Sequence, residues 1–428
     1  MKRRMMFMAA GLLITGMALY RVAAAQDTIK VGVLHSLSGT MAISETTLKD
    51  TILMMIDEQN KKGGLLGKKL QAVVVDPASD WPLFAEKAAQ LLEKDKVAVV
   101  FGCWTSVSRK SVLPVFEKDN GLLFYPVQYE GEESSKNVIY TGAAPNQQAI
   151  PAVDYLMKDV AVKRWVLEGT DYVYPRTTNK ILEAYLLAKG VKPEDISINY
   201  TPFGHSDWQA RVAAIKRFGS AGKKTAVVST INGDANVPFY KELGNQKISA
   251  EDIPVVAFSV GEEELSGLDT KPLVGHLAAW NYFQSITTPA NKTFIDQWHA
   301  YIKKPNRTTN DPMEAHYIGF NLWVKAVQKA GTTDVEKVLA ALPGLETPNL
   351  TGGIAKLLPN HHITKPVYIG EVKANGQFNV VWKSTGTVPG DAWSDYLTGS
   401  KDIDADWVTL KCGNYNKVTK KCSGQNYK

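Results

Sequence analysis

The sequence has few cysteines and no cluster of basic residues. Its 428 residues include three cysteines, at positions 103, 412 and 422, and their spacing does not fit a zinc site. Lysine and arginine are scattered, and four of them lie in the first 21 residues, so much of the formal charge of +6 belongs to the N-terminus. A nucleic-acid partner is therefore not expected, because such a partner requires a basic face or stripe.

Sequence motifs for catalysis are also missing. There is no Gly-x-Ser-x-Gly, His-Glu-x-x-His or Gly-x-x-x-x-Gly-Lys-Ser/Thr motif. We interpret His361-His362 as a solvated loop pair rather than a metal site, and Glu262-Glu263-Glu264 as a solvated helix start. We expect a buried thiol at Cys103, because this residue follows an apolar run. A catalytic thiol is not expected, since nothing in the sequence places a base such as His35 beside it. The sequence predicts no catalytic residue, no metal site and no cofactor.

The N-terminus has the pattern of a secretory signal peptide. Basic residues at positions 2–4 precede an apolar run at 5–20 and then Ala23-Ala24-Ala25. A membrane anchor is the alternative, but the run is shorter than the roughly 20 residues that a spanning helix needs. We expect cleavage after Ala25 and a periplasmic mature protein without a lipid anchor at this site. In an exported protein, Cys412 and Cys422 are expected to close a small disulfide loop.

Short β-branched segments alternate with longer helical ones along most of the chain. Strands are expected at 28–34, 69–76, 97–101, 122–125, 164–167, 196–200, 226–230 and 255–258, with helices between them. This alternation predicts an α/β fold with parallel sheets, and two doubly wound sheets fit better than one. We assign residues 26–145 to a first lobe, to which 286–345 return, and 146–275 to a second lobe, to which 350–383 return. Residues 384–428 form a C-terminal tail.

The loops after the strands carry the candidate binding residues. Ligands of open α/β sheets bind outside the carboxyl ends of the strands. These loops combine aromatic rings with hydroxyls, amides and carboxylates, a mixture that suits a small neutral polar ligand held between rings. The candidate ligand-binding residues are Trp104, Thr105, Ser106, Tyr125, Val127, Gln128, Glu130, Asp171, Tyr172, Tyr174, Gly233 and Asp234.

Structural roles compete with binding at several of these positions. Trp104 fits a cap on the core, and Ser106 fits the N-terminus of a helix that we expect at 109–120. Tyr172 and Tyr174 alternate, so they share one face if the segment is extended. Asp234 fits a helix cap as well as a ligand contact.

Several long motifs resemble one protein family. The segments 102–110 (GCWTSVSRK) and 125–131 (YPVQYEG), with 35–45, 75–81, 141–150, 170–179 and 232–239, are similar to urea-binding proteins of bacterial urea ABC uptake systems. The resemblance extends to about residue 382, and the wider group is the branched-chain amino-acid type of periplasmic binding protein. It implies the type I fold, with two Rossmann-like lobes joined by a hinge of three crossovers. It also implies an ABC permease in the inner membrane as partner.

The wider group includes a cytoplasmic amide sensor, whose pocket positions match residues here. The match implies that Trp104 and Ser106 line the pocket from one lobe. Tyr172 and Tyr174 do so from the other. A threonine of the sensor is replaced by Val127, so Gln128 or Glu130 is expected to supply the polar contact. The tail past about residue 384 departs from the family.

Urea is the ligand that the resemblance favours, captured by domain closure. A short-chain amide such as acetamide or formamide is the alternative ligand. A periplasmic sensor and an amidohydrolase are alternative classes of protein. An aliphatic amino acid fits less well, because it needs a cation for its carboxylate and an acid for its ammonium group in the same cleft.

Overall fold

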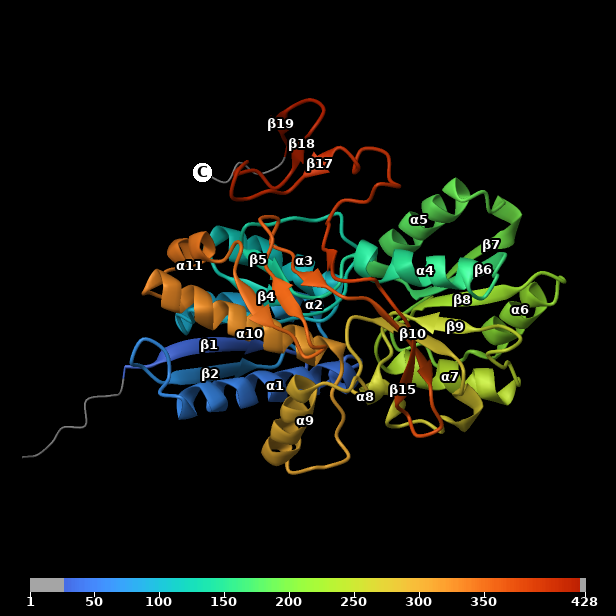
Figure 1. Cartoon of the computed structure of the whole chain (residues 1–428), viewed down its shortest axis with the longest axis horizontal. Helices are drawn as coiled ribbons and strands as arrows, with labels where there is room; N and C mark the ends of the chain where they lie inside the picture. The colour runs from blue at the N-terminus through green and yellow to red at the C-terminus, as the bar shows by residue number, and fades with distance from the viewer. Residues whose placement is uncertain (1–26, 424–428) are drawn as a thin grey trace, which may run out of the picture.

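The computed structural model describes residues 27–423, which form two α/β lobes and a C-terminal tail (Figure 1). The predicted signal peptide and its cleavage after Ala25 lie outside the described residues. Each lobe has its own main sheet, which confirms the prediction of two doubly wound halves. None of the described helices is long and apolar enough to cross a membrane.

The first lobe contains a five-stranded parallel sheet in the order β2-β1-β3-β4-β5. Its strands are β1 Ile29–Leu34, β2 Leu70–Val75, β3 Val99–Gly102, β4 Leu123–Tyr125 and β5 Val138–Tyr140. Its helices are α1 Ala42–Lys61, α2 Trp81–Ala89 with a π-helical turn Gln90–Lys94, α3 Ser106–Lys118, α9 Pro289–Ile302, α10 Asp311–Ala330 and α11 Val335–Ala341.

The second lobe contains a seven-stranded mixed sheet in the order β15-β14-β10-β9-β8-β6-β7. Its strands are β6 Arg164–Thr170, β7 Ile196–Thr201, β8 Thr225–Thr230, β9 Val255–Ala257, β10 Leu277–Trp280, β14 Tyr368–Val372 and β15 Phe378–Lys383. Its helices are α4 Ala149–Lys158, α5 Val173–Ala188, α6 Gln209–Gly219, α7 Asn236–Asn245 and α8 Glu262–Leu265. The last two strands form an antiparallel hairpin, and Gly376 adopts the positive φ of 75° that its turn needs.

The chain passes between the lobes three times before the tail. It leaves the first sheet after β5, returns after β10, and leaves again between the short strand β13 (Thr364–Lys365) and β14. Asn281 lies where these crossings meet, and its side-chain amide donates to the carbonyls of Gln147 and Pro366 at 3.0 and 2.7 Å. The crossings are therefore tied to one another by hydrogen bonds.

Helix α10 begins and ends where the sequence provides capping residues. Asn310 caps α10, because its side chain accepts the backbone N–H of Met313 at 3.2 Å, and Gly331 ends the helix with a φ of 67°. Within the lobe, Phe320 of α10 packs on Phe101 of β3 with ring centroids 5.6 Å apart. The core therefore lies between this helix and the sheet.

Small strands complete the structure. They are β11 Glu346–Pro348, β12 Ile354–Lys356, β16 Val388–Pro389, β17 Ile403–Asp404, β18 Tyr415–Asn416 and β19 Lys421–Cys422. Strands β11 and β12 pack with the first lobe, and the chain joins the second sheet at Tyr368. The predicted disulfide between Cys412 and Cys422 is present in the tail, and Cys103 is a buried free thiol, as expected.

Two predictions of solvated polar residues are wrong. His361 and His362 are buried. Their loop hydrogen-bonds to β5 beside the edge of the first sheet, and the His362 ring stacks on Tyr140 with ring centroids 4.7 Å apart. Burial lowers the pKa of both histidines to about 4, so they are neutral at pH 7. Glu262 and Glu264 are also buried, since α8 packs against the first lobe.

Two local predictions also differ from the structure. Helix α1 begins at Ala42, earlier than the apolar pattern of the sequence indicates, because its first turns bury polar side chains such as Glu45. Tyr172 and Tyr174 do not share an extended segment, since α5 begins at Val173. Their rings nevertheless lie 6.1 Å apart.

Candidate functional site

The loop between β3 and α3 places Trp104, Thr105 and Ser106 at the carboxyl end of the first sheet. Thr105 is the N-cap of α3, since its hydroxyl accepts the backbone N–H of Ser108 at 3.1 Å. Ser106 is the first helical residue, and its hydroxyl donates to the Glu130 carboxylate. The capping role that we weighed for Ser106 therefore belongs to its neighbour, and the Ser106 side chain faces the other lobe-1 candidates.

A buried ion network lies directly behind these residues. Arg109 is 0% exposed, and its guanidinium donates to Glu133 at 2.7 Å, to Glu130 at 3.2 Å and to the Ser106 hydroxyl at 3.2 Å. Its charge also lies 4.7 Å from the ring centre of Tyr125. No local pattern in the sequence predicts this network, apart from the position of Arg109 inside the 102–110 motif.

The charges in this network compensate one another. Burial by itself lowers the pKa of Arg109, but the Glu133 and Glu130 carboxylates outweigh it and raise that pKa well above its usual value. Burial raises the pKa of Glu133, yet Arg109 and Lys110 overcome it and lower that pKa to about 2. Every nitrogen of the Arg109 guanidinium has a partner, so no free cation is offered to a ligand here.

Hydrogen bonds join the two lobes across the cleft. The Trp104 indole N–H donates to Asn232 Oδ1 at 3.2 Å, and Ser259 Oγ donates to the same oxygen at 2.9 Å. The Gln128 side-chain amide donates to Ser259 Oγ. Asn232 follows β8 and Ser259 follows β9, whereas Trp104 and Gln128 belong to the first lobe. The lobes are therefore closed on each other at the strand ends.

Two buried polar atoms in this contact have no hydrogen-bond partner among the described residues. They are Gln128 Oε1 and the Tyr174 hydroxyl, on side chains that are 3% and 2% exposed. Burial raises the pKa of Tyr174, while weak hydrogen bonding from the nearby Gln128 and Ser259 side chains acts in the opposite direction. An unpaired buried polar group costs about 1–3 kcal/mol, so a ligand that hydrogen-bonds to these atoms would recover part of that cost.

Aromatic rings enclose the same place. Tyr172 is half-buried and lies 4.7 Å from the Phe203 ring. Burial raises its pKa well above the usual value, and the nearby Tyr174, Tyr125 and Glu130 add to the effect. The Tyr125 hydroxyl donates to the Trp104 carbonyl. Tyr172 and Tyr125 therefore come from opposite lobes and lie beside Gln128, Glu130 and Tyr174, which we call the buried cluster.

The structure does not bring all predicted residues into the buried cluster. Asp171 is exposed and pairs with Arg176 at 2.6 Å, which lowers the Asp171 pKa. The Asp234 side chain is also exposed, although its backbone N–H donates to the Thr40 carbonyl of the first lobe at 3.1 Å. Val127 is buried in the core of the first lobe.

Gly233 allows the lobes to approach. Its φ is 70°, and a Cβ at this position would lie 2.7 Å from the Thr40 carbonyl oxygen. A larger residue would meet both the strain of a positive φ and a clash with the facing lobe. Gly233 therefore acts through its backbone at the rim of the cleft.

Sequence reasoning missed Asn232 and Ser259, which connect the lobes. Asn232 directly precedes the candidates Gly233 and Asp234, and Ser259 follows a predicted strand. The rule that ligands bind at strand ends would have found both residues.

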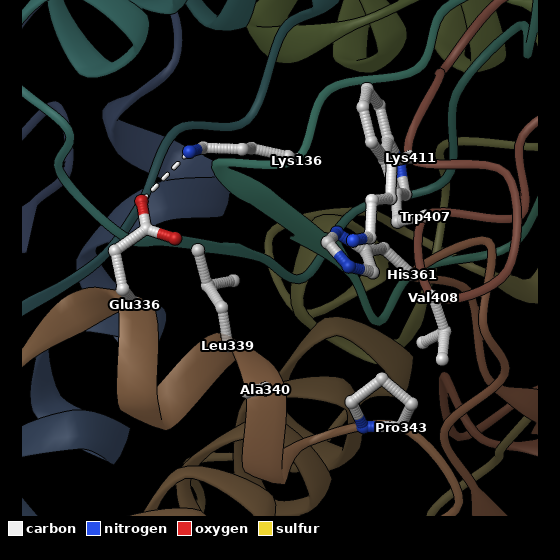
Figure 2. A pocket seen from close by; sticks show the side chains of 9 residues that line it. All are labelled: Lys136, Glu336, Leu339, Ala340, Pro343, His361, Trp407, Val408 and Lys411. Carbon is white, nitrogen blue, oxygen red and sulfur yellow. Dashed lines mark hydrogen bonds and ion pairs between the residues drawn. The ribbon is translucent and has the colours of Figure 1, made fainter. Parts of the chain in front are cut away.

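A cavity of about 410 Å³ lies elsewhere, between the tail and the first lobe (Figure 2). Figure 2 shows Trp407 and Val408 of the tail on one side and Leu339 of α11 across from them, and none of the predicted binding residues lines it. Within residues 27–423, no group of three or more His, Cys, Asp or Glu side chains is arranged to hold a metal ion.

Comparison with known proteins gives a consistent picture. The family model described as "Periplasmic binding protein domain" matches residues 29–399. The Leu/Ile/Val-binding protein BraC3 of Rhizobium johnstonii is 26% identical over 343 residues, covering 77% of this chain and 88% of that protein. The solute-binding protein of an ABC transporter from R. palustris, in complex with 4-hydroxybenzoate, aligns with a TM-score of 0.73 at 21% identity, covering 85% of this chain and 98% of the other.

A shorter match concerns limonene hydroxylase from Geobacillus stearothermophilus. The two sequences are 30% identical over 124 residues, which cover 28% of this chain and 22% of that protein. So partial a match carries no conclusion about activity. The longer matches cover both lobes and agree with the predicted two-lobed fold.

Proposed function

This chain belongs to the periplasmic binding protein family, whose members serve as substrate-binding proteins of ABC transporters, and on that premise we propose that it captures urea. Capture takes place between the lobes and needs no chemical step, since proteins of this family bind solutes without catalysis. The family is periplasmic, and the proposed cleavage after Ala25 would release the chain there. Its partner is an inner-membrane ABC permease.

One observation carries the choice of ligand. Gln128 Oε1 and the Tyr174 hydroxyl are buried and adjacent, neither makes a hydrogen bond of normal geometry, and they come from opposite lobes. Urea has one carbonyl acceptor and four N–H donors. The Gln128 oxygen accepts one N–H group, and the Tyr174 hydroxyl donates to the carbonyl. Both orphan groups are then satisfied by one small molecule that also joins the lobes.

The charge balance of the site favours a neutral ligand. The Arg109 guanidinium is held by Glu130 and Glu133, and its nitrogens are all engaged. A carboxylate ligand, such as leucine or 4-hydroxybenzoate, would place another negative charge beside these two acids. Burying it without a free cation is unfavourable. A neutral amide meets no such penalty.

Closure supplies the rest of the enclosure. Trp104 and Tyr125 of the first lobe and Tyr172 of the second provide ring surface around the orphan groups. The indole bond from Trp104 to Asn232 exists only when the lobes meet. Closing on urea therefore turns ligand occupancy into a change of shape that a permease, or a receptor if the protein is a sensor, is able to recognise.

Titration calorimetry with urea, acetamide, formamide, leucine and 4-hydroxybenzoate tests the proposal. Urea is expected to bind most tightly, with acetamide or formamide weaker and both carboxylates not detectable. Tighter binding of acetamide or formamide would assign the site to the alternative amide ligand. Tight binding of leucine or 4-hydroxybenzoate without urea binding would reject the proposal.

A pair of variants locates the ligand. Tyr174→Phe removes only the hydroxyl, and the loss of one hydrogen bond of about 1–2 kcal/mol weakens urea binding about 5- to 30-fold. Tyr240→Phe is the matched control, because Tyr240 is equally buried in the second lobe but lies in its hydrophobic core. Equal urea affinity of the two variants would place the ligand somewhere else.

A further inference from the structure

The loop that carries Glu130 is held on its outer side by the C-terminal tail. The Glu132 backbone N–H donates to the Ala392 carbonyl at 2.6 Å. The Glu132 carboxylate accepts the Ser394 backbone N–H at 2.8 Å and also the Ser400 hydroxyl. Glu132 is only two residues after Glu130 in the sequence, so the tail contacts the same loop that carries Glu130. We call residues 391–400 the strap.

The fit between loop and strap is close. Gly131 and Glu132 have φ values of 68° and 55°, so the chain turns sharply directly after Glu130. A Cβ on Gly131 would lie 2.5 Å from the Ala392 carbonyl oxygen. The strap backbone thus occupies space that only a glycine leaves open, and Glu132 adopts a conformation that is unfavourable for a non-glycine residue. The hydrogen bonds from the strap are therefore needed to hold this turn.

The strap also contacts the first crossing and the second lobe. The Asp391 backbone N–H donates to Asn146 Oδ1 at 3.2 Å, and Asn146 donates to the Pro389 carbonyl at 2.8 Å. The Tyr396 ring meets Tyr185 of α5 edge-on with centroids 4.8 Å apart. The strap is therefore anchored on both sides of the hinge and does not move freely with the Glu130 loop.

We propose that the strap and Glu132 position Glu130 for ligand binding. Glu130 binds Ser106 and Arg109 in the cluster, and its placement depends on the turn that follows it. When the strap bonds to Glu132 are lost, the strained turn relaxes and Glu130 leaves its partners. The effect on affinity rests on the proposed urea site, whereas the effect on the loop does not.

Two variants test this role. Ser400→Ala removes one bond to Glu132, and Glu132→Ala removes the carboxylate that accepts both the Ser394 N–H and the Ser400 hydroxyl. Ser423→Ala is the matched control, because this tail serine donates within the tail to Asn414 and does not contact the loop. Hydrogen–deuterium exchange of residues 129–134 and urea titration are measured on all three full-length variants and the wild type.

Ser400→Ala and Glu132→Ala are expected to raise exchange in residues 129–134 at least fivefold and to weaken urea binding at least fivefold. Ser423→Ala changes neither quantity. Unchanged exchange in both test variants overturns the inference, and so does raised exchange with unchanged urea affinity. If the wild type binds no urea, the proposed function fails, and the exchange result alone decides whether the strap holds the loop.

Discussion

Replacement of Arg109 by methionine tests the ion network behind the cleft. The side chain is fully buried between Glu130 and Glu133, and methionine has a similar length without charge. The substitution leaves two buried carboxylates without their cation. Removal of one partner from a buried ion pair costs about 3–5 kcal/mol.

The pKa of Glu133 gives an independent magnitude. It falls from 4.5 to about 2 in the folded protein, and each unit corresponds to about 1.4 kcal/mol, so the network contributes about 3 kcal/mol through this group. Because the folded pKa is the lower one, this stability is present above pH 4.5 and is lost as the pH falls towards 2. The penalty of Arg109→Met is therefore largest at pH 7 and smaller at pH 4.

Guanidinium chloride denaturation followed by tryptophan fluorescence at pH 7 and pH 4 measures this penalty. Urea is unsuitable as the denaturant because it is the proposed ligand. Arg176→Met is the control, since Arg176 is exposed and its pair with Asp171 contributes little. A penalty for Arg109→Met below about 1 kcal/mol at pH 7, or an equal penalty at both pH values, would refute the reasoning.

Three further predictions concern other parts of the molecule. Burial raises the pKa of Glu314 to about 8, so the folded state retains a proton that the unfolded state loses. The melting temperature should therefore fall from pH 5 to pH 8. A Glu314→Gln variant whose melting temperature fell just as steeply over this pH range would contradict this. Replacing Cys412 and Cys422 by serine removes about 2–3 kcal/mol of loop closure from the tail, so limited proteolysis should cut the tail faster while both lobes keep their melting temperature. Gly233→Ala should weaken ligand binding, because its Cβ would clash with the Thr40 carbonyl of the facing lobe, and it should also lower the melting temperature slightly through the strain of its positive φ; unchanged affinity would argue against closure at this point.

Much of the fold could be predicted because strands and helices alternate with clear periods. The buried thiol of Cys103 was predicted from neighbouring residues alone. The start of α1 could not be found in this way, because it buries polar residues such as Glu45 that bond to His35 ten positions away. Local sequence carries no information about such distant partners.

The same limit applies to the candidate site. Strand ends indicated Trp104 and Gln128, and the structure joins both to the second lobe. Whether a polar residue is buried depends on which segments pack over it. For this reason the sequence alone does not show that Asp171 is exposed and Glu130 is buried. The solvated histidine pair was wrong for that reason, since His362 is covered by Tyr140, a residue more than 200 positions earlier.

A crystal structure of the protein grown with urea tests the central claim most directly. The account predicts planar density between the closed lobes, within hydrogen-bond distance of Gln128 Oε1 and the Tyr174 hydroxyl and bordered by Trp104 and Tyr172. Density for urea outside this cluster would contradict the account. So would closed lobes in which both polar groups stay unpaired and no urea is found between them.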